Sequence, residues 1–267
     1  MAELRTVAPD GLEIYNLHAN IDPNIRRDFL GLPEAGAIQA VVNFADTNPG
    51  GPEPDLALLG FLAQNQSAID RWNTLLGEGM RITGTAGTDA HQNALPIMLA
   101  DGERGDSYRR MIRWFANIAL VADPRDPVMI EEAVRAGRLF VAFELLGTPV
   151  GFDARAVAPA GTVELGGQLR ATDGAVFTVD LPTVRALDPM LPTPAIAGRL
   201  LRIDAAGVHE LATGSDGTLA APMDLPGAYR VEVTMIPRHL GPYLGDLGTE
   251  FADGSLPWIY SSPIYVE

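Results

Sequence analysis

The pattern of strand-forming and helix-forming residues changes near residue 150, and this change constrains the fold of the chain more than any other feature. Before that point, short apolar runs that favour strands alternate with stretches of helical periodicity, which is typical of α/β domains with parallel strands. After it, short β-prone runs are separated by Gly, Pro and Asp, as in an all-β sandwich. We therefore expect an α/β domain over residues 1–150 and a β-sandwich domain over residues 151–267.

Four strands are expected in the first part, and the α/β pattern predicts that they are parallel. They lie near residues 12–17, 82–86, 117–122 and 139–143. Residues 18–54 are rich in Pro and Gly and are predicted to be mainly loop.

Two helices of the first part have clear sequence signals. The apolar residues Ile69, Trp72, Leu75 and Leu76 recur at helical spacing and predict one buried face. A second helix is predicted to begin at Asp126, which is followed by Pro127 in the favoured first position. Its expected buried stripe consists of Met129, Ile130, Ala133 and Val134.

Composition excludes several classes of function. The net charge is −15, which opposes general binding to nucleic acid or to an anionic membrane and is compatible with a site that attracts cations. All 19 basic residues are Arg and there is no Cys, so Schiff-base lysines, thiolate nucleophiles and iron–sulfur clusters are excluded. Residues 1–25 have no signal-peptide pattern, and we expect a soluble protein whose compartment the sequence leaves open.

The segment Thr83–His91, Thr-Gly-Thr-Ala-Gly-Thr-Asp-Ala-His, contains the most informative residues. It is typical of a strand that leads into a Gly-rich turn, and this turn presents Asp89 and His91. In barrels of parallel strands, the loops after the strands open onto the catalytic face. Carboxylate and imidazole are good ligands for Zn, Mn or Fe, so Asp89 and His91 are predicted metal ligands. The alternative is that Asp89 caps the turn and His91 is an ordinary surface residue.

Four segments resemble motifs of the polymerase and histidinol phosphatase (PHP) superfamily and occur in the same order along the chain. The resemblance is strongest to the carbaryl-hydrolase-like metallohydrolases of that superfamily. Gly87–His91 is similar to the last metal motif of that family, and Asp10–Asn16 is similar to the strand before it. Ile130–Phe143 resembles a helix and strand of the barrel, and Pro257–Tyr265 resembles the end of an appended β domain. The resemblance implies the C-terminal part of a PHP-type (βα) barrel followed by a β domain.

The sequence departs from that family in its histidines. PHP enzymes open with a strand bearing His-x-His, whereas this chain has no His-x-His and only His18, His91, His209 and His239. Asp89 and His91 supply two ligands, but metal sites need at least three from the protein. The resemblance therefore implies a truncated PHP hydrolase with an incomplete site for a divalent metal (Zn, Mn or Fe).

Three residues at or just past the end of the first strand are candidates for the rest of the site. Glu13 and His18 are predicted to be catalytic, with His18 also a candidate ligand, and Asn16 is predicted to contact the substrate. The alternative for Glu13 is a structural carboxylate paired with an Arg.

The resemblance to the PHP superfamily implies that a metal-bound water attacks a phosphoester, amide, carbamate or ester bond of a small-molecule substrate. One competing hypothesis is a non-catalytic binding or structural protein that keeps the half-barrel and the β domain. Another is a split enzyme whose His-x-His half comes from a second polypeptide. Because a barrel cut in two exposes unpaired strand edges, we expect self-association, or binding of an N-terminal barrel half, at the strand near Leu12–Leu17.

Overall fold

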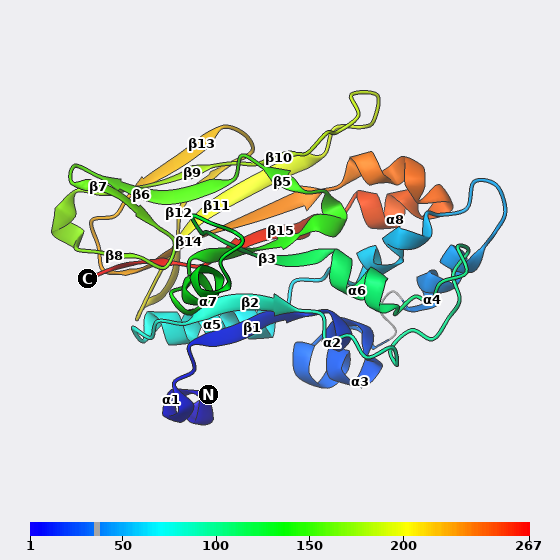
Figure 1. Cartoon of the computed structure of the whole chain (residues 1–267), viewed down its shortest axis with the longest axis horizontal. Helices are drawn as coiled ribbons and strands as arrows, with labels where there is room; N and C mark the ends of the chain where they lie inside the picture. Colours follow the sequence, from blue (N-terminus) through cyan, green and yellow to red (C-terminus); the bar gives the residue numbers. More distant parts are fainter. Residues whose placement is uncertain (35–37) are drawn as a thin grey trace.

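The structure is a computed structural model that describes residues 1–34 and 38–267, and it is mixed α/β (Figure 1). The helices are α1 (Ala2–Val7), α2 (Leu17–Ile21), α3 (Pro23–Ile25), α4 (Ile38–Val41), α5 (Gln66–Gly77), α6 (Tyr108–Arg113), α7 (Pro127–Arg135) and α8 (Gly248–Ala252). A π-helical turn covers Arg26–Leu30. Turns of 3₁₀ helix cover Val42–Ala45, Pro54–Phe61, Glu144–Leu146, Ala171–Asp173, Arg238–Tyr243 and Gly245–Leu247.

The strands of the first 150 residues are β1 (Gly11–Asn16), β2 (Thr83–Gly87), β3 (Phe115–Ala119), β4 (Leu139–Phe143) and β5 (Pro149–Val150). Those that follow are β6 (Asp153–Ala158), β7 (Gly161–Glu164), β8 (Gln168–Leu169), β9 (Val176–Asp180), β10 (Thr183–Val184), β11 (Ala195–Asp204), β12 (Gly207–Gly214), β13 (Thr218–Pro222), β14 (Gly227–Ile236), β15 (Leu256–Ser261) and β16 (Ile264–Val266).

The described strands form four sheets. β1 and β2 make a two-stranded parallel sheet, and β5 and β10 make a two-stranded antiparallel one. An eight-stranded sheet runs in the order β12-β11-β14-β15-β4-β3, with β16 and β8 attached beside β14. A four-stranded antiparallel sheet, β13-β9-β6-β7, lies along one side of it (Figure 1).

Side chains that alternate along β14 join three layers: the four-stranded sheet, the large sheet and helix α5. The ring of Tyr229 lies 6.3 Å from that of Phe177 in β9, which joins the large sheet to the four-stranded sheet. The next residue, Arg230, points to the opposite face and places its guanidinium carbon 4.7 Å from the ring centre of Trp72 in α5. Successive side chains of a strand point to opposite faces, so one strand binds both neighbouring layers.

Helix α5 confirms the predicted amphipathic pattern. Its four expected core residues are all buried, and the indole N–H of Trp72 donates to the carbonyl of Ile82 at 2.9 Å. This bond ties the helix to the start of β2, so α5 packs between the parallel pair and the large sheet. Within the described parts of the chain, none of the helices combines the length and apolar character that a bilayer span requires.

The prediction of four parallel strands is correct for β1 and β2 and wrong for β3 and β4. These two are antiparallel, and the amide of Leu120 donates to the carbonyl of Arg138 at 2.8 Å to extend their ladder. Helix α7 therefore lies in the connection of a hairpin and does not cross over a sheet. The alternation of strand and helix suggested a crossover, but antiparallel neighbours require none.

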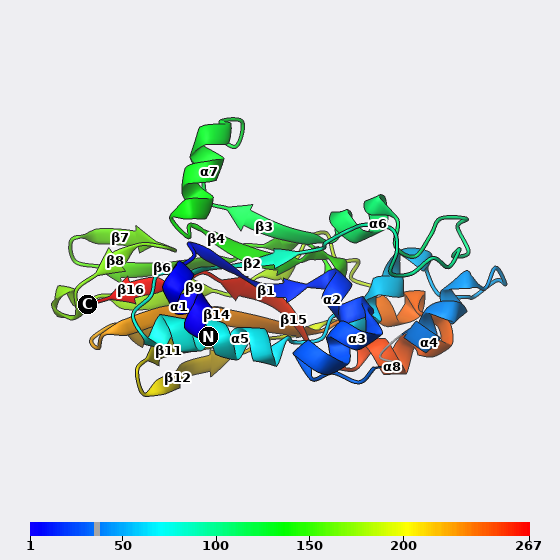
Figure 2. The same ribbon diagram turned by 90° about the horizontal axis from the view of Figure 1, so that it is seen from below.

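Helix α7 begins as predicted but does not bury its apolar stripe. The side chain of Asp126 accepts a hydrogen bond from the amide of Val128 at 2.9 Å, and Pro127 occupies the first turn. Of the four stripe residues, Ala133 alone is buried, whereas Ile130 and Val134 are 37% and 39% exposed. The helix projects from the body of the molecule (Figure 2), so that Ala133 alone of its apolar stripe packs against the rest of the chain.

Short helical segments replace much of the loop expected over residues 18–54, of which 35–37 lie outside the described residues. α2, α3 and α4 and the π-helical turn lie there, and Ile21, Val41 and Phe44 are buried. The π-helical turn ends at Gly31, which has a left-handed φ of 67°. These segments are too short for sequence periodicity to predict, and tertiary burial stabilises them.

The large sheet takes strands from both sides of residue 150. β4 pairs with β15 in the register Ala142↔Ile259, so a strand of the first part and one from near the C-terminus are neighbours. Antiparallel strands dominate after residue 150, in agreement with the expected β character. The division into domains 1–150 and 151–267 stays a prediction.

Candidate metal centre

The parallel pairing of β1 and β2 brings two predicted sets of site residues together. Asn16 at the end of β1 is the register partner of Gly87 at the end of β2. Because the strands are parallel, the segments that follow them leave from the same edge. α2 presents His18, and the turn after β2 presents Asp89 and His91.

These three side chains form one group, here called the metal triad: His18, Asp89 and His91. One possible ligand atom from each lies within 4.8 Å of the others. The Nδ1 atoms of the two imidazoles are 3.2 Å apart, and Nε2 of His91 lies 2.8 Å from Oδ1 of Asp89. His18 is 9% exposed, whereas the side chains of Asp89 and His91 are about half exposed. The triad thus has a buried side and a side open to solvent.

The donor set and its spacing fit a divalent metal ion. Two ligands bound at roughly 2.0–2.1 Å in a tetrahedral arrangement are about 3.3 Å apart, close to the imidazole spacing found here. Catalytic zinc sites use three protein ligands and leave one position to water, and the triad offers three. In the arrangement found here Asp89 contacts Nε2 of His91 while Nδ1 of that ring faces His18. This is the position of a carboxylate that orients a metal-bound imidazole, and Asp89 would have to turn toward Nδ1 to serve as the third ligand.

The backbone around Asp89 has an uncommon conformation. Asp89 and Gln92 have φ angles of 48° and 55°, in the left-handed region that few residues other than Gly adopt. Asp tolerates this region better than most residues. Two left-handed residues within four positions bend the chain here, and the side chains of Asp89 and His91 are in contact.

Asn16 ends β1, whereas Glu13 lies three residues earlier in the strand, contrary to its predicted place at the strand end, and both are outside the triad. Nδ2 of Asn16 donates to Oε2 of Glu13 at 2.7 Å, and Oδ1 of Asn16 accepts from the amide of Ala19 at 2.8 Å as the N-cap of α2. Among the ion pairs of the described residues, Glu13 has no Arg partner, in contrast to the structural alternative. Its carboxylate instead occupies the space beside Gly87, where an added Cβ would lie 1.6 Å from Oε1.

Asn16 therefore has a structural task that the sequence analysis did not assign. By capping α2 it orients the helix that presents His18, and through Glu13 it is linked to the end of β2. The catalytic role of Glu13 and the substrate contact of Asn16 stay predictions.

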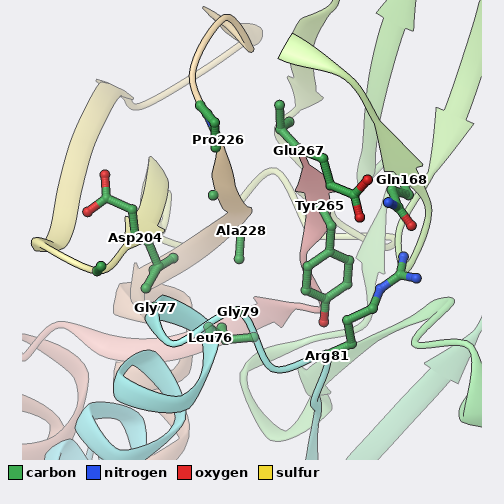
Figure 3. Close-up of a pocket in the computed structure, with 14 residues that line it drawn as sticks. Leu76, Gly77, Gly79, Arg81, Gln168, Asp204, Pro226, Ala228, Tyr265 and Glu267 are labelled. Carbon is green, nitrogen blue, oxygen red and sulfur yellow. The ribbon is translucent and has the colours of Figure 1, made fainter.

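A cavity of about 380 Å³ at the other end of the molecule is a weaker candidate site (Figure 3). It lies between the C-terminal end of α5 and strands β11, β14 and β16, and the guanidinium of Arg81 stacks 4.7 Å from the ring centre of Tyr265. No histidine is among the described residues that line it, so it lacks an acid–base group for neutral pH.

Neither the protein-family models nor the curated proteins compared with this sequence give a match. The function of this chain is therefore inferred from the geometry of the triad and from the resemblance of its motifs to the PHP superfamily.

Proposed function

We propose that the chain is a metal-dependent hydrolase of the PHP type that acts on a phosphoester, amide, carbamate or ester bond of a small molecule. The observation that carries the proposal is the metal triad, in which one buried imidazole and two solvent-facing donors meet at the C-terminal edge of a parallel strand pair. Such edges are where α/β barrels place their catalytic residues.

Each residue of the site has a separate proposed role. His18 would hold a bound ion from the buried side, and Asp89 and His91 would hold it from the exposed side. A bound divalent ion would lower the pKa of a coordinated water toward neutrality and polarise the bond under attack. Glu13, fixed by Asn16, is the proposed proton acceptor, since it is the other carboxylate at this edge.

Two imidazoles and one carboxylate suit Zn, and they are also acceptable to Mn and Fe. A larger metal cluster of the PHP kind would need ligands beyond the triad. With three protein donors, we expect one metal site of moderate affinity.

Metal binding tests the proposal directly. Purified protein freed of metal by a chelator is titrated with Zn²⁺ and Mn²⁺ by isothermal calorimetry, alongside the Asp89→Ala and His91→Ala variants. We expect one site in the native chain, and affinity at least about tenfold lower in each variant, because each removes one of three ligands.

His209→Ala is the matched control for this experiment. His209 also contacts a carboxylate, with Nε2 2.9 Å from Oδ1 of Asp204, but it lies outside the triad. Its loss should leave metal affinity unchanged. Equal losses in the His91 and His209 variants, or no stoichiometric binding by the native chain, would contradict the proposed site.

Hydrolysis is measured separately with 4-nitrophenyl phosphate and 4-nitrophenyl acetate in the presence of each metal. Glu13→Gln keeps the size of the side chain and a polar contact to Asn16 but removes the proton acceptor. We expect the variant to bind metal as the native chain does and to lose most of its turnover. Equal turnover in both proteins would remove Glu13 from the mechanism.

The alternative function is a non-catalytic binding protein. The exposed apolar stripe of α7 favours it, because a projecting helix with apolar residues on its surface is typical of a face used for contacts. Under this alternative the chain would bind metal at the triad without turnover of either ester.

A further inference from the structure

Arg104, which is partly exposed, and Asp106, which is buried, form an anchor beside the turn that carries two of the triad residues. The side chain of Asp106 is fully buried, and its Oδ2 accepts from the amide of Leu95 at 2.8 Å. Nε and Nη2 of Arg104 donate to the two oxygens of Asp106 at 2.8 and 3.0 Å. This two-pronged geometry fixes the guanidinium in a single plane.

The same guanidinium reaches the turn itself. Nη2 of Arg104 also donates to the carbonyl of Gln92 at 2.6 Å, one residue beyond His91. Gln92 has the left-handed φ of 55°, which a residue other than Gly keeps only where its surroundings impose it. The bond from Arg104 is therefore in the right place to hold this uncommon conformation.

Backbone hydrogen bonds hold the two ends of the segment 97–105, which contains Arg104, close together. The amide of Gly105 donates to the carbonyl of Ile97, and the amide of Leu99 donates to that of Glu103. Burial by itself would raise the pKa of Asp106, but the guanidinium of Arg104 and the amide of Leu95 hold that pKa below its usual range. Asp106 thus stays ionised, and the anchor is a charge-assisted pair.

We infer that Arg104 and Asp106 are positioning residues for the metal triad: through the carbonyl of Gln92 they fix the turn that presents Asp89 and His91. The inference rests on the proposed function, because it concerns the affinity of the same metal site. Residues that orient metal ligands without contacting the ion typically change affinity by about 10- to 100-fold when they are replaced.

Three variants separate the contacts of the anchor. Arg104→Gln removes the charge and both contacts, and Asp106→Asn keeps the shape but removes the charge. Arg104→Lys keeps the charge pair but lacks the planar fork needed to bond Asp106 and Gln92 together. Binding of Co²⁺ is followed by visible absorption, which reports ligand geometry as well as affinity.

Arg109→Gln is the matched control. Arg109 forms ion pairs with Asp55 and Glu103 and is 41% exposed in its side chain against 33% for Arg104, but it makes no contact with the turn. Arg109→Gln should lower the free energy of unfolding in urea by about as much as Arg104→Gln does, and it should bind Co²⁺ as the native chain does.

We expect Arg104→Gln and Asp106→Asn to weaken Co²⁺ binding by about tenfold or more and to alter the spectrum, with Arg104→Lys between them and the native chain. Unchanged affinity and spectrum in Arg104→Gln, or an equal loss in Arg109→Gln, would overturn the inference.

Hydrogen exchange in metal-free protein distinguishes this inference from the proposed function. Faster exchange of amides in residues 88–95 of Arg104→Gln, but not of Arg109→Gln, supports the anchor even if the native chain binds no metal. In that case the proposed function fails and the positioning of the turn stands. Native exchange in Arg104→Gln would contradict the anchor, whatever the metal result.

Discussion

Gly87 lies where β2 passes closest to the side chain of Glu13. A Cβ at this position would be 1.6 Å from Oε1 of Glu13, so Gly87→Ala must displace the carboxylate. The atom that it meets is the end of an exposed, flexible side chain, which can move aside, so we expect a loss of less than about 1 kcal/mol in the free energy of unfolding.

A double-mutant cycle with Glu13→Ala gives the control for this prediction. In that background the space beside Gly87 is empty, so Gly87→Ala should cost much less. Urea unfolding of the four proteins yields the coupling energy. Additive costs would mean that Glu13 does not occupy this space.

His239 supplies a residue-scale prediction about pH. It is 4% exposed, its Nε2 lies 3.1 Å from the carbonyl of Leu146, and burial lowers its pKa below the usual value. The imidazole therefore binds a proton more readily in the unfolded chain than in the folded one. The contribution of His239 to the free energy of unfolding is fully present above the unfolded pKa of about 6.5, and it is lost as the pH falls below that value.

The His239→Gln variant isolates this contribution. Glutamine keeps an N–H for Leu146 but does not titrate. Urea unfolding between about pH 7.5 and 5 should show a shallower pH dependence in the variant, by up to about 1.4 kcal/mol per pH unit in the window where only the unfolded state is protonated. Parallel curves for the two proteins would show that His239 takes no part.

At the scale of elements, α7 shows that a helix can be amphipathic in sequence and unpacked in structure. Ala133 is fully buried, whereas Val128 is 60% exposed. Ala133→Glu should cost at least about 2 kcal/mol, because it buries a charge in occupied space. Val128→Glu should change the free energy of unfolding by less than about 0.5 kcal/mol. Chemical denaturation of the pair checks the orientation of the helix, and a larger loss at Val128 would contradict it.

Strand β1 is paired with β2 on one side, and in the described chain no other strand pairs with it. Open edges of this kind favour addition of another strand. We predict that the chain self-associates through β1, or binds an N-terminal barrel half there. Sedimentation velocity over a wide range of concentration should show growth of a dimer, and a concentration-independent monomer would speak against self-association.

At the scale of the whole molecule, the large sheet predicts a single cooperative unit. All five residues of β4 are buried, and this strand lies between β3 and β15. Unfolding followed by far-UV circular dichroism and by Trp fluorescence should therefore coincide. Expressed alone, residues 1–150 should not fold, because the fully buried β4 would lose β15, one of its two partner strands. A well-dispersed NMR spectrum of that piece would instead support two independent domains.

The buried pair of Arg230 and Glu232 adds to this coupling. Both side chains are almost fully buried, their charged atoms are 2.7 Å apart, and Arg230 also donates to Asn73 of α5 at 2.9 Å. Burial by itself raises the pKa of Glu232, but Arg230 and Arg199 hold it below its usual range. A helix from the first part and a sheet from the second thus share one charged contact.

Local sequence signals were sufficient where one element decides the outcome. The apolar spacing of α5, the Asp126–Pro127 start of α7 and the turn bearing Asp89 and His91 all follow from neighbouring residues in the chain. Parallel strand ends then made it reasonable to expect His18 at the same edge. The anchor of Arg104 and Asp106 gave no such signal, because an Arg and an Asp in a polar stretch are typical of exposed loops.

The sequence by itself determined the four main strands of the first part, helices α5 and α7, the β character after residue 150 and the chemical character of the metal triad, because these depend on local periodicity and on residue type. Only the tertiary structure decided the direction of β3 and β4, the exposure of α7 and the contacts of Glu13. The physical reason is that strand periodicity reports which side chains share a face and carries no information about direction. Burial, in turn, depends on whether another layer lies against that face.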